Sequence, residues 1–209
     1  YLASFVTMLG RVYYGFSIDE SVSEEAIDNG AEVHIGMDFN VGKMCAVCCS
    51  VNGETLDAFD EIVLIDSNTR EMCQEIKHRF PNRDVIIYPD SSGSSRSTKA
   101  ISGQTDHSII KEEFGFQVFA RSKNPPVADR VNNVNSMLKS ADGERKLLIN
   151  PKCREVIKCL DGQVYKEGTN QPDKDGGLDH MSDAIGYLVN YKFNLIKRDL
   201  KMITIDWSY

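Results

Sequence analysis

The clearest pattern of apolar and polar residues lies in the first third of the chain. The run VHIGMD at 33–38 alternates large apolar residues with histidine and glycine and ends in an acid, Asp38. Strand-like runs follow at 43–51 and 55–65, and an Asn-Gly dipeptide separates them. Asn-Gly favours a tight hairpin turn between antiparallel strands. The pattern therefore predicts three antiparallel strands in succession.

A continuous apolar run, VIIYPD at 85–90, also ends in an acid, Asp90. A run without polar alternation is typical of a central strand that is covered on both faces. Burying a carboxylate without a partner costs free energy or forces it to take up a proton. We therefore expect other charged groups to meet these acids, although Asp38 taken alone is equally consistent with a surface acid that begins a turn.

The remaining elements alternate between helices and short strands. A helix that follows Ser67 or Asn68, either of which can cap it, carries apolar residues at helical spacing and ends before Pro81. Further elements are expected in chain order as a helix at 108–114, a strand at 117–120, a helix at 127–140, a strand in KLLIN, a helix at 153–160 and a helix at 180–193. Together with the hairpin strands, this order predicts an α/β fold of the ribonuclease H-like class, with a central mixed sheet.

Two segments, 1–30 and 161–179, fall outside this pattern of helices and strands. Residues 1–30 are expected to be a lead-in or linker, and residues 31–209 to be the domain itself. Because the chain begins with Tyr, we expect it to be part of a longer polypeptide. The segment 161–179 has no apolar period and leads directly to the last helix. A long polar stretch inside a domain is usually functional or mobile, so we expect Gly168–Gly177 to be mobile, to cover the acidic site and to control access to it.

Charge and composition exclude several classes of function. The net charge of −7 argues against a surface that coats DNA, but not against an enzyme whose acids gather around a metal ion. No apolar run is long enough to span a membrane. The six cysteines do not have the spacing of a secreted disulfide scaffold, and Cys45 and Cys48 would point to opposite faces of one strand. We therefore expect reduced, mostly buried thiols.

The expected fold would bring four aspartates, Asp38, Asp90, Asp179 and Asp183, close together. Strands 33–38 and 85–90 would lie side by side, which places Asp38 opposite Asp90. In the sequence DHMSD, Asp179 and Asp183 are four residues apart and share one helix face. Such carboxylates repel each other unless a cation lies among them, and hard oxygen ligands suit Mg²⁺ or Mn²⁺. Two such ions, roughly 3.5 to 4 Å apart, can activate water and stabilise the leaving oxygen of a phosphodiester.

Three motifs, HIGMDFNVG, IIYPDSSG and GGLDHMSDAIGYLV, with ADRVNNVNSML between the last two, resemble the nuclease motifs of the large terminase subunit of tailed bacteriophages. The resemblance implies a two-metal DNA endonuclease that cuts concatemeric viral DNA during headful packaging. It implies double-stranded DNA, an ATPase domain of the same polypeptide, the portal protein and the small terminase subunit as partners. It also implies the cytoplasm of the infected bacterial host as the location, with no membrane contact.

The resemblance assigns roles to individual residues. Asp38, Asp90 and Asp183 match the family's catalytic, metal-binding acids. His180 matches a position where some members have a further metal-site histidine. Asp179 matches less consistently. We count it among the metal-site candidates and expect it to cap the last helix or orient His180, so that its loss reduces activity only in part.

Five basic residues are candidates for contacts to DNA phosphates. Arg96 and Lys99 lie in the loop after Asp90, where a solvated charge is an equal alternative. Arg121, Lys123 and Arg130 follow the strand at 117–120, close to the sheet edge that carries the acids. No base-reading motif is visible, so we expect little sequence specificity.

Two other classes of function remain open from the sequence. GMDFNVG also resembles the acid-and-glycine hairpin that opens actin-like sugar or acyl kinases, although no second glycine-rich phosphate turn follows. The segment from Gly36 to Lys43 is one residue too long for a phosphate-binding loop and has Met44 where Ser or Thr is required. A catalytically inactive docking module of the packaging motor is the third hypothesis, and the presence of all three acids argues against it.

Overall fold

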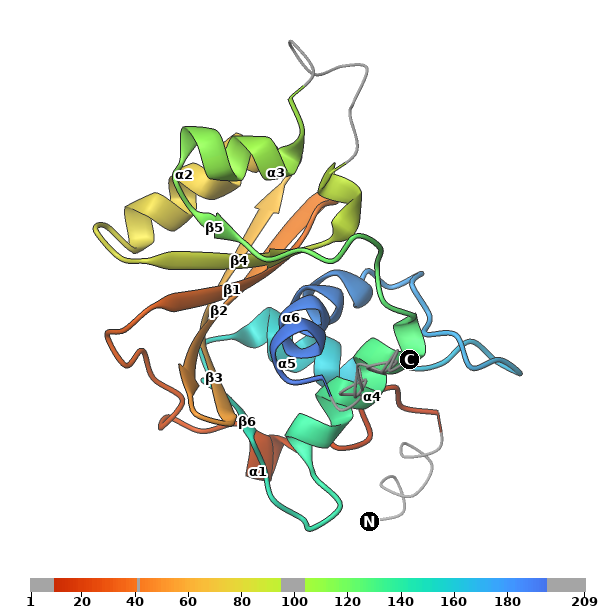
Figure 1. The fold of residues 1–209 in the computed structure, drawn as a ribbon. Coiled ribbons are helices and arrows are strands. Elements are labelled where there is room, and N and C mark those ends of the chain that lie inside the picture. The colour runs from red at the N-terminus through yellow and green to blue at the C-terminus, as the bar shows by residue number, and fades with distance from the viewer. Residues whose placement is uncertain (1–9, 41, 95–103, 195–209) are drawn as a thin grey trace, which may run out of the picture.

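The computed structural model describes residues 10–40, 42–94 and 104–194. The described strands form one mixed sheet in the order β5-β4-β1-β2-β3-β6 (Figure 1). Their bounds are β1 Val33–Asp38, β2 Lys43–Asn52, β3 Thr55–Ile65, β4 Val85–Pro89, β5 Gln117–Val118 and β6 Leu147–Ile149. β1 to β3 pair antiparallel, whereas β4 pairs parallel with β1. The predicted ribonuclease H-like class and its three opening antiparallel strands are confirmed.

Helices cover both faces of the sheet (Figure 1). They are α1 Ile18–Ser21, α2 Thr69–Arg79, the 3₁₀ turn η1 Ser91–Ser94, α3 Asp106–Ser108, the π-helical turn η3 Ile109–Glu113, α4 Val127–Leu138, α5 Arg154–Gly162 and α6 Asp179–Lys192. α4, α5 and α6 bury one apolar core against the sheet, and α2 with η3 buries a second core on the other face. Cys45 and Cys48 belong to different cores, as the alternation of β2 predicts. All six cysteines are buried free thiols.

Several boundaries differ from the sequence-based expectation: the strand expected at 117–120 ends at Val118, the helix expected at 127–140 ends at Leu138, and the helix expected at 153–160 spans Arg154–Gly162. The helix expected at 108–114 starts earlier, at Asp106, because the Thr105 hydroxyl accepts a hydrogen bond from the backbone N–H of Ser108 in a capping box. The last helix starts at Asp179 and not at His180. Its N-cap is Leu178, and no side chain caps it, so the expectation that Asp179 caps this helix is wrong. The alternative, that Asp179 orients His180, agrees with the 3.8 Å between Oδ1 of Asp179 and Nε2 of His180.

The described part of the lead-in packs on the domain. Val12, Tyr13 and Phe16 are buried in the same core as α4 to α6. Arg11 pairs with Val164 in an isolated bridge, which ties the lead-in to the polar segment before α6. Among the described residues, no helix has the length and apolar character that crossing a bilayer requires.

A single glycine sets the distance between α6 and the sheet. Gly36 lies in the middle of β1, and a Cβ atom at this position would lie 2.1 Å from the carbonyl oxygen of Ala184 in α6. Only glycine permits this approach, since real Cβ atoms do not come so close to backbone. The contact brings the start of α6 to the end of β1, where the candidate site lies.

Candidate active site

Asp38 and Asp90 lie at the same edge of the sheet. β1 and β4 are parallel neighbours whose register pairs Met37 with Pro89, so the next residues in line are the two acids. The backbone N–H of Asp90 donates to the carbonyl oxygen of Met37 at 3.2 Å, which continues the strand pairing by one residue. The carboxyl ends of both strands thus present an acid at one place, as the sequence predicts.

α6 brings a second group of side chains to this edge. Nδ1 of His180 lies 3.1 Å from Oδ2 of Asp38. Asp179 and Asp183, one helical turn apart, line the same pocket as Asp38 and Asp90. The pocket has a volume of about 400 Å³ and is lined by Asp38, Phe39, Asn40, Asp90, Asn124, Pro125, Val127, Arg130, Lys174, Asp179, His180, Asp183 and Tyr187. We call it the acidic pocket.

Asp183 is paired with a buried arginine. Nη1 of Arg130 in α4 donates to Oδ1 of Asp183 at 2.7 Å, and the arginine side chain is only 7% exposed. The guanidinium also lies over the ring of Tyr187, 4.5 Å from its centroid. The sequence suggested that Arg130 contacts the DNA backbone, but in the structure this buried arginine forms an ion pair with Asp183. The pair fixes one oxygen of Asp183, and the other, Oδ2, lies 3.5 Å from Nζ of Lys174.

Asp90 is held by two neutral side chains. Nδ2 of Asn124 donates to its Oδ1 at 2.6 Å, and the hydroxyl of Tyr187 donates to its Oδ2 at 3.3 Å. Burial raises the pKa of Tyr187 well above the usual value, so this hydroxyl stays protonated and remains a donor. The ring of Tyr187 therefore contacts Arg130, which holds Asp183, and the hydroxyl of Tyr187 contacts Asp90.

The polar segment before α6 also reaches the acids. Nζ of Lys174 lies 3.0 Å from Oδ2 of Asp179 and 3.5 Å from Oδ2 of Asp183. Partial burial lowers the pKa of Lys174, but its contacts with these two carboxylates raise it more, so the ammonium stays charged. The expectation that this segment lies at the acidic site agrees with these contacts, while its mobility stays a prediction.

The acids influence one another electrostatically. Burial, together with the negative charges of Asp183 and Asp90, raises the pKa of Asp38 to about 6, although the contact with His180 opposes this shift. A carboxyl group whose charge is disfavoured in this way gains from a nearby cation. Arg130 and Lys174 supply positive charge to Asp183 and Asp179, but neither pairs with Asp38.

The donor set of the acidic pocket fits Mg²⁺ or Mn²⁺. Carboxylate oxygens from four aspartates line it, and such hard oxygen ligands suit these ions. Oδ1 of Asp179 is buried and has no hydrogen-bond partner, which leaves one acceptor without a donor. Within the described residues, however, no three potential ligands already have metal-binding geometry. The residues match the ions in chemistry, and the carboxylates now contact His180, Arg130 and Lys174.

The structure places the other sequence-based candidates differently. Arg121 and Lys123 line a neighbouring pocket and do not line the acidic one. Arg96 and Lys99 lie outside the described residues. Sequence reasoning missed Asn124 and Tyr187, whose partner Asp90 is far away in the chain. It also missed Lys174, which lies in a segment without an apolar period although its partners Asp179 and Asp183 follow closely. A signal for Arg130 was present, since it falls within the apolar stripe of α4, where an arginine needs a buried acid as its partner.

Comparison with solved structures identifies similar folds. The large terminase of a thermophilic bacteriophage superposes with a TM-score of 0.69 at 18% identity, covering 88% of this chain and 46% of that protein. The large terminase nuclease domain of bacteriophage SPP1 with bound Mn gives 0.55 at 15% identity, covering 80% of this chain and 93% of that one. The large terminase nuclease of a second thermophilic phage, G20c, with bound magnesium gives 0.56 at 10% identity, covering 88% and 96%. This chain thus spans less than half of the first of these proteins.

A family model describes the same region. Comparison with curated protein sequences found no match. The model of the terminase RNaseH-like domain matches residues 35–192, which include most of β1, all of β4 and α6, and all four aspartates of the acidic pocket. This match gives no support to the kinase alternative. The chain belongs to the terminase RNaseH-like domain family.

Proposed function

We propose that this protein is a metal-dependent DNA endonuclease that cuts concatemeric viral DNA during genome packaging, with little sequence specificity. The observation that carries the proposal is the meeting of Asp38, Asp90 and Asp183 in one pocket at the sheet edge. These acids come from three separate elements, so no local structural need explains why they gather. Family membership supports a role in packaging phage DNA.

Two Mg²⁺ or Mn²⁺ ions are the proposed cofactors. Asp38, Asp90 and Asp183 would hold them, and Asp179 and His180 belong to the proposed metal site as further members. When bound, such ions activate water for attack on a phosphodiester and stabilise the leaving oxygen. The Mn bound to the SPP1 nuclease domain and the magnesium bound to the G20c nuclease support a divalent metal for this family.

The protein's own side chains hold the acids in place. Asn124 and Tyr187 bond to Asp90, Arg130 bonds to Asp183, and His180 bonds to Asp38. Such partners fix the direction of a carboxylate. Mutating one of them typically lowers metal affinity or activity by about 10- to 100-fold. Their role in the proposed reaction is to present oxygens in a fixed arrangement to ions and scissile phosphate.

The wider setting is also a proposal. We propose double-stranded DNA as the substrate, and an ATPase domain of the same polypeptide, the portal protein and the small terminase subunit as partners. The similar large terminase of which this chain covers 46% was also solved in complex with ATP-gamma-S and with ADP, which supports an ATPase part elsewhere in such proteins. The proposed location is the cytoplasm of the infected bacterial host.

A plasmid-nicking assay tests the proposal. Supercoiled plasmid is incubated with the protein and millimolar Mn²⁺, with and without excess EDTA. We expect relaxed and linear DNA with Mn²⁺ and none with EDTA. Asp183→Asn should abolish cutting, and Asp142→Asn, at an exposed turn outside the pocket, is the matched control that should retain it.

Two results would contradict the proposal. Absence of nicking by a correctly folded wild-type protein would favour the inactive docking module. Equal nicking by the wild type and Asp183→Asn would show that the activity does not come from the acidic pocket.

A further inference from the structure

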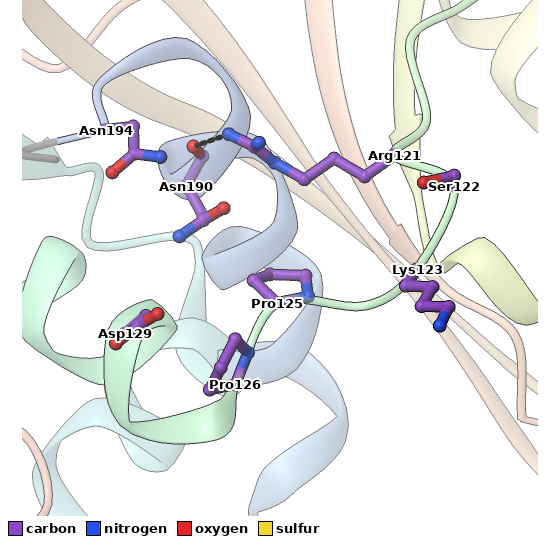
Figure 2. A pocket seen from close by; sticks show the side chains of 8 residues that line it. All are labelled: Arg121, Ser122, Lys123, Pro125, Pro126, Asp129, Asn190 and Asn194. Atoms are coloured by element: carbon purple, nitrogen blue, oxygen red, sulfur yellow. Dashed lines mark hydrogen bonds between the residues drawn. The ribbon is translucent and has the colours of Figure 1, made fainter. Parts of the chain in front are cut away.

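A second pocket, shown in Figure 2, shares the residue Pro125 with the acidic pocket. It has a volume of about 530 Å³ and is lined by Arg121, Ser122, Lys123, Pro125, Pro126, Asp129, Asn190 and Asn194. Its residues come from the connection between β5 and α4, from the first turn of α4 and from the end of α6. We call it the basic pocket, because its two most exposed charged groups are Arg121 and Lys123.

The basic and acidic pockets adjoin each other. Pro125 lines both of them. A small cavity between them shares Asn124 and Tyr187 with the acidic pocket, and Arg121 and Asn190 with the basic pocket. A polymeric ligand with one unit bound in the acidic pocket would therefore place its following units toward the basic pocket.

The two cations of the basic pocket differ in how they are held. Arg121 is fixed, since its Nη2 donates to the carbonyl oxygen of Asn190 at 3.0 Å and its guanidinium lies 5.6 Å from the ring centroid of Tyr191. Figure 2 shows this side chain reaching across from the connection to α6. Lys123 is exposed and forms no ion pair with another described residue. One cation is thus positioned in advance, and the other is available to a ligand.

A buried polar atom also points to a ligand. Asn190 is 2% exposed and lines the basic pocket, and its Oδ1 has no hydrogen-bond partner. A buried polar atom without a partner costs free energy unless something bonds to it. A side-chain amide carries both donors and an acceptor, so it can bond to the phosphate, sugar or base edge of a nucleotide.

We infer that the basic pocket binds the backbone of one DNA strand beside the phosphate that is cut, with Arg121 and Lys123 as its phosphate contacts. This inference rests on the proposed function and extends it by giving the strand a direction away from the acids. A protein of net charge −7 repels DNA, and the acidic pocket repels it most. Cations directly along the strand's path offset this repulsion and fix the register of the phosphates.

Asp129 makes the inference sharper. Its carboxylate lines the same pocket and opposes any phosphate bound there. If a DNA strand occupies the pocket, the charges of Lys123 and Asp129 must have opposite effects on the affinity for DNA. Removing the positive charge of Lys123 weakens binding, whereas removing the negative charge of Asp129 strengthens it.

The test measures DNA binding apart from cleavage. Fluorescence anisotropy of a labelled duplex is recorded in EDTA over a series of salt concentrations, for the wild type, Lys123→Ala, Asp129→Asn and Lys77→Ala. Lys77 is the matched control, an exposed lysine on α2 in the opposite helical layer. The logarithm of the DNA-binding constant falls linearly with the logarithm of the salt concentration, and loss of one phosphate contact makes this slope shallower by about 0.9. We expect this change for Lys123→Ala, no change for Lys77→Ala, and tighter binding for Asp129→Asn.

The outcome separates this inference from the proposed function. If Lys123→Ala and Lys77→Ala have the same salt slope as the wild type, the basic pocket is not a phosphate site, whether or not the protein nicks plasmid. Weaker binding by Asp129→Asn would likewise overturn the inference. A changed slope for Lys123→Ala together with absent nicking would leave the strand contact intact and remove only the proposed cleavage.

Discussion

The acidic and basic pockets share Pro125 as a wall, yet they hold their charges in different ways. In the acidic pocket, Asp38, Asp90 and Asp183 each contact a side chain from another element. In the basic pocket, Lys123 is exposed and forms no ion pair with the rest of the described chain. The first pocket is therefore built for fixed geometry, whereas the second combines a fixed cation, Arg121, with an adaptable one, Lys123.

Substitutions in the two pockets should therefore have different consequences. A carboxylate held from several sides acts together with its partners, so removing either member disturbs the site. An exposed lysine acts alone through its charge, and its removal changes binding gradually.

Replacing one of the three central acids should have the largest effect. Asp38→Asn, Asp90→Asn and Asp183→Asn should each remove detectable nicking, because the amide supplies one neutral oxygen where the carboxylate supplied charge. Their stabilities should differ. Asp38→Asn relieves repulsion and should melt at the wild-type temperature or above, while Asp183→Asn weakens the bond to buried Arg130 and should lose roughly 2 kcal/mol of unfolding free energy.

Nicking assays and urea denaturation of the three variants check this prediction. The sequence alone suggests equal or higher stability for all three, and the Arg130 contact is what separates Asp183 from the others. A stability order with Asp183→Asn above Asp38→Asn would contradict the role given to this contact.

Arg130→Gln should come next. It leaves Asp183 without its buried cation, so we expect a loss of roughly 3 kcal/mol in stability and of ~10- to 100-fold in nicking rate at saturating Mn²⁺. Arg79→Gln is a control, because Arg79 pairs with Asp60 and Glu75 at the surface, where a pair contributes about 1 kcal/mol or less. If Arg130→Gln retained the full rate, the arginine would hold the fold but not the site.

Asp179→Asn should give an intermediate result. Oδ2 of Asp179 already contacts Lys174, and Oδ1 is buried without a hydrogen bond. We expect a loss of ~10- to 100-fold in nicking rate, as for residues that support metal ligands. Complete loss, equal to that of Asp183→Asn, would make Asp179 a direct ligand.

Lys174→Ala should have the smallest effect, and in the opposite direction. The ammonium competes with a divalent ion for oxygens of Asp179 and Asp183, so its removal should tighten Mn²⁺ binding up to about fivefold, the equivalent of an exposed ion pair. The rise of melting temperature with Mn²⁺ measures this affinity. Lys166→Ala in the same segment is the control, and weaker Mn²⁺ binding by Lys174→Ala would show that the lysine assists the site.

The sequence predicted the part of this structure that depends on local pattern. Alternation, the Asn-Gly turn and the apolar run at 85–90 were sufficient for β1 to β4, because strand pairing follows from turn chemistry and burial. With β1 and β4 adjacent, the meeting of Asp38 and Asp90 followed directly. The two aspartates of α6 followed from helical spacing.

The contacts that hold these acids were not predictable in the same way. The bond between Arg130 and Asp183 depends on how α4 packs against α6, and the bond between Asn124 and Asp90 joins residues 34 positions apart. Lys174 reaches the acids from a segment with no apolar period. Local propensity fixes neither the packing of two helices nor the path of a loop, so these partners required the structure.

The most direct test of the account is anomalous scattering from crystals grown with Mn²⁺. We expect two Mn²⁺ peaks in the acidic pocket, with oxygens of Asp38, Asp90 and Asp183 within about 2.5 Å of at least one of them. Crystals of Asp183→Asn should lose at least one peak. Well-ordered wild-type crystals with no Mn²⁺ among these three aspartates would contradict the central claim that the acids meet in order to hold metal ions.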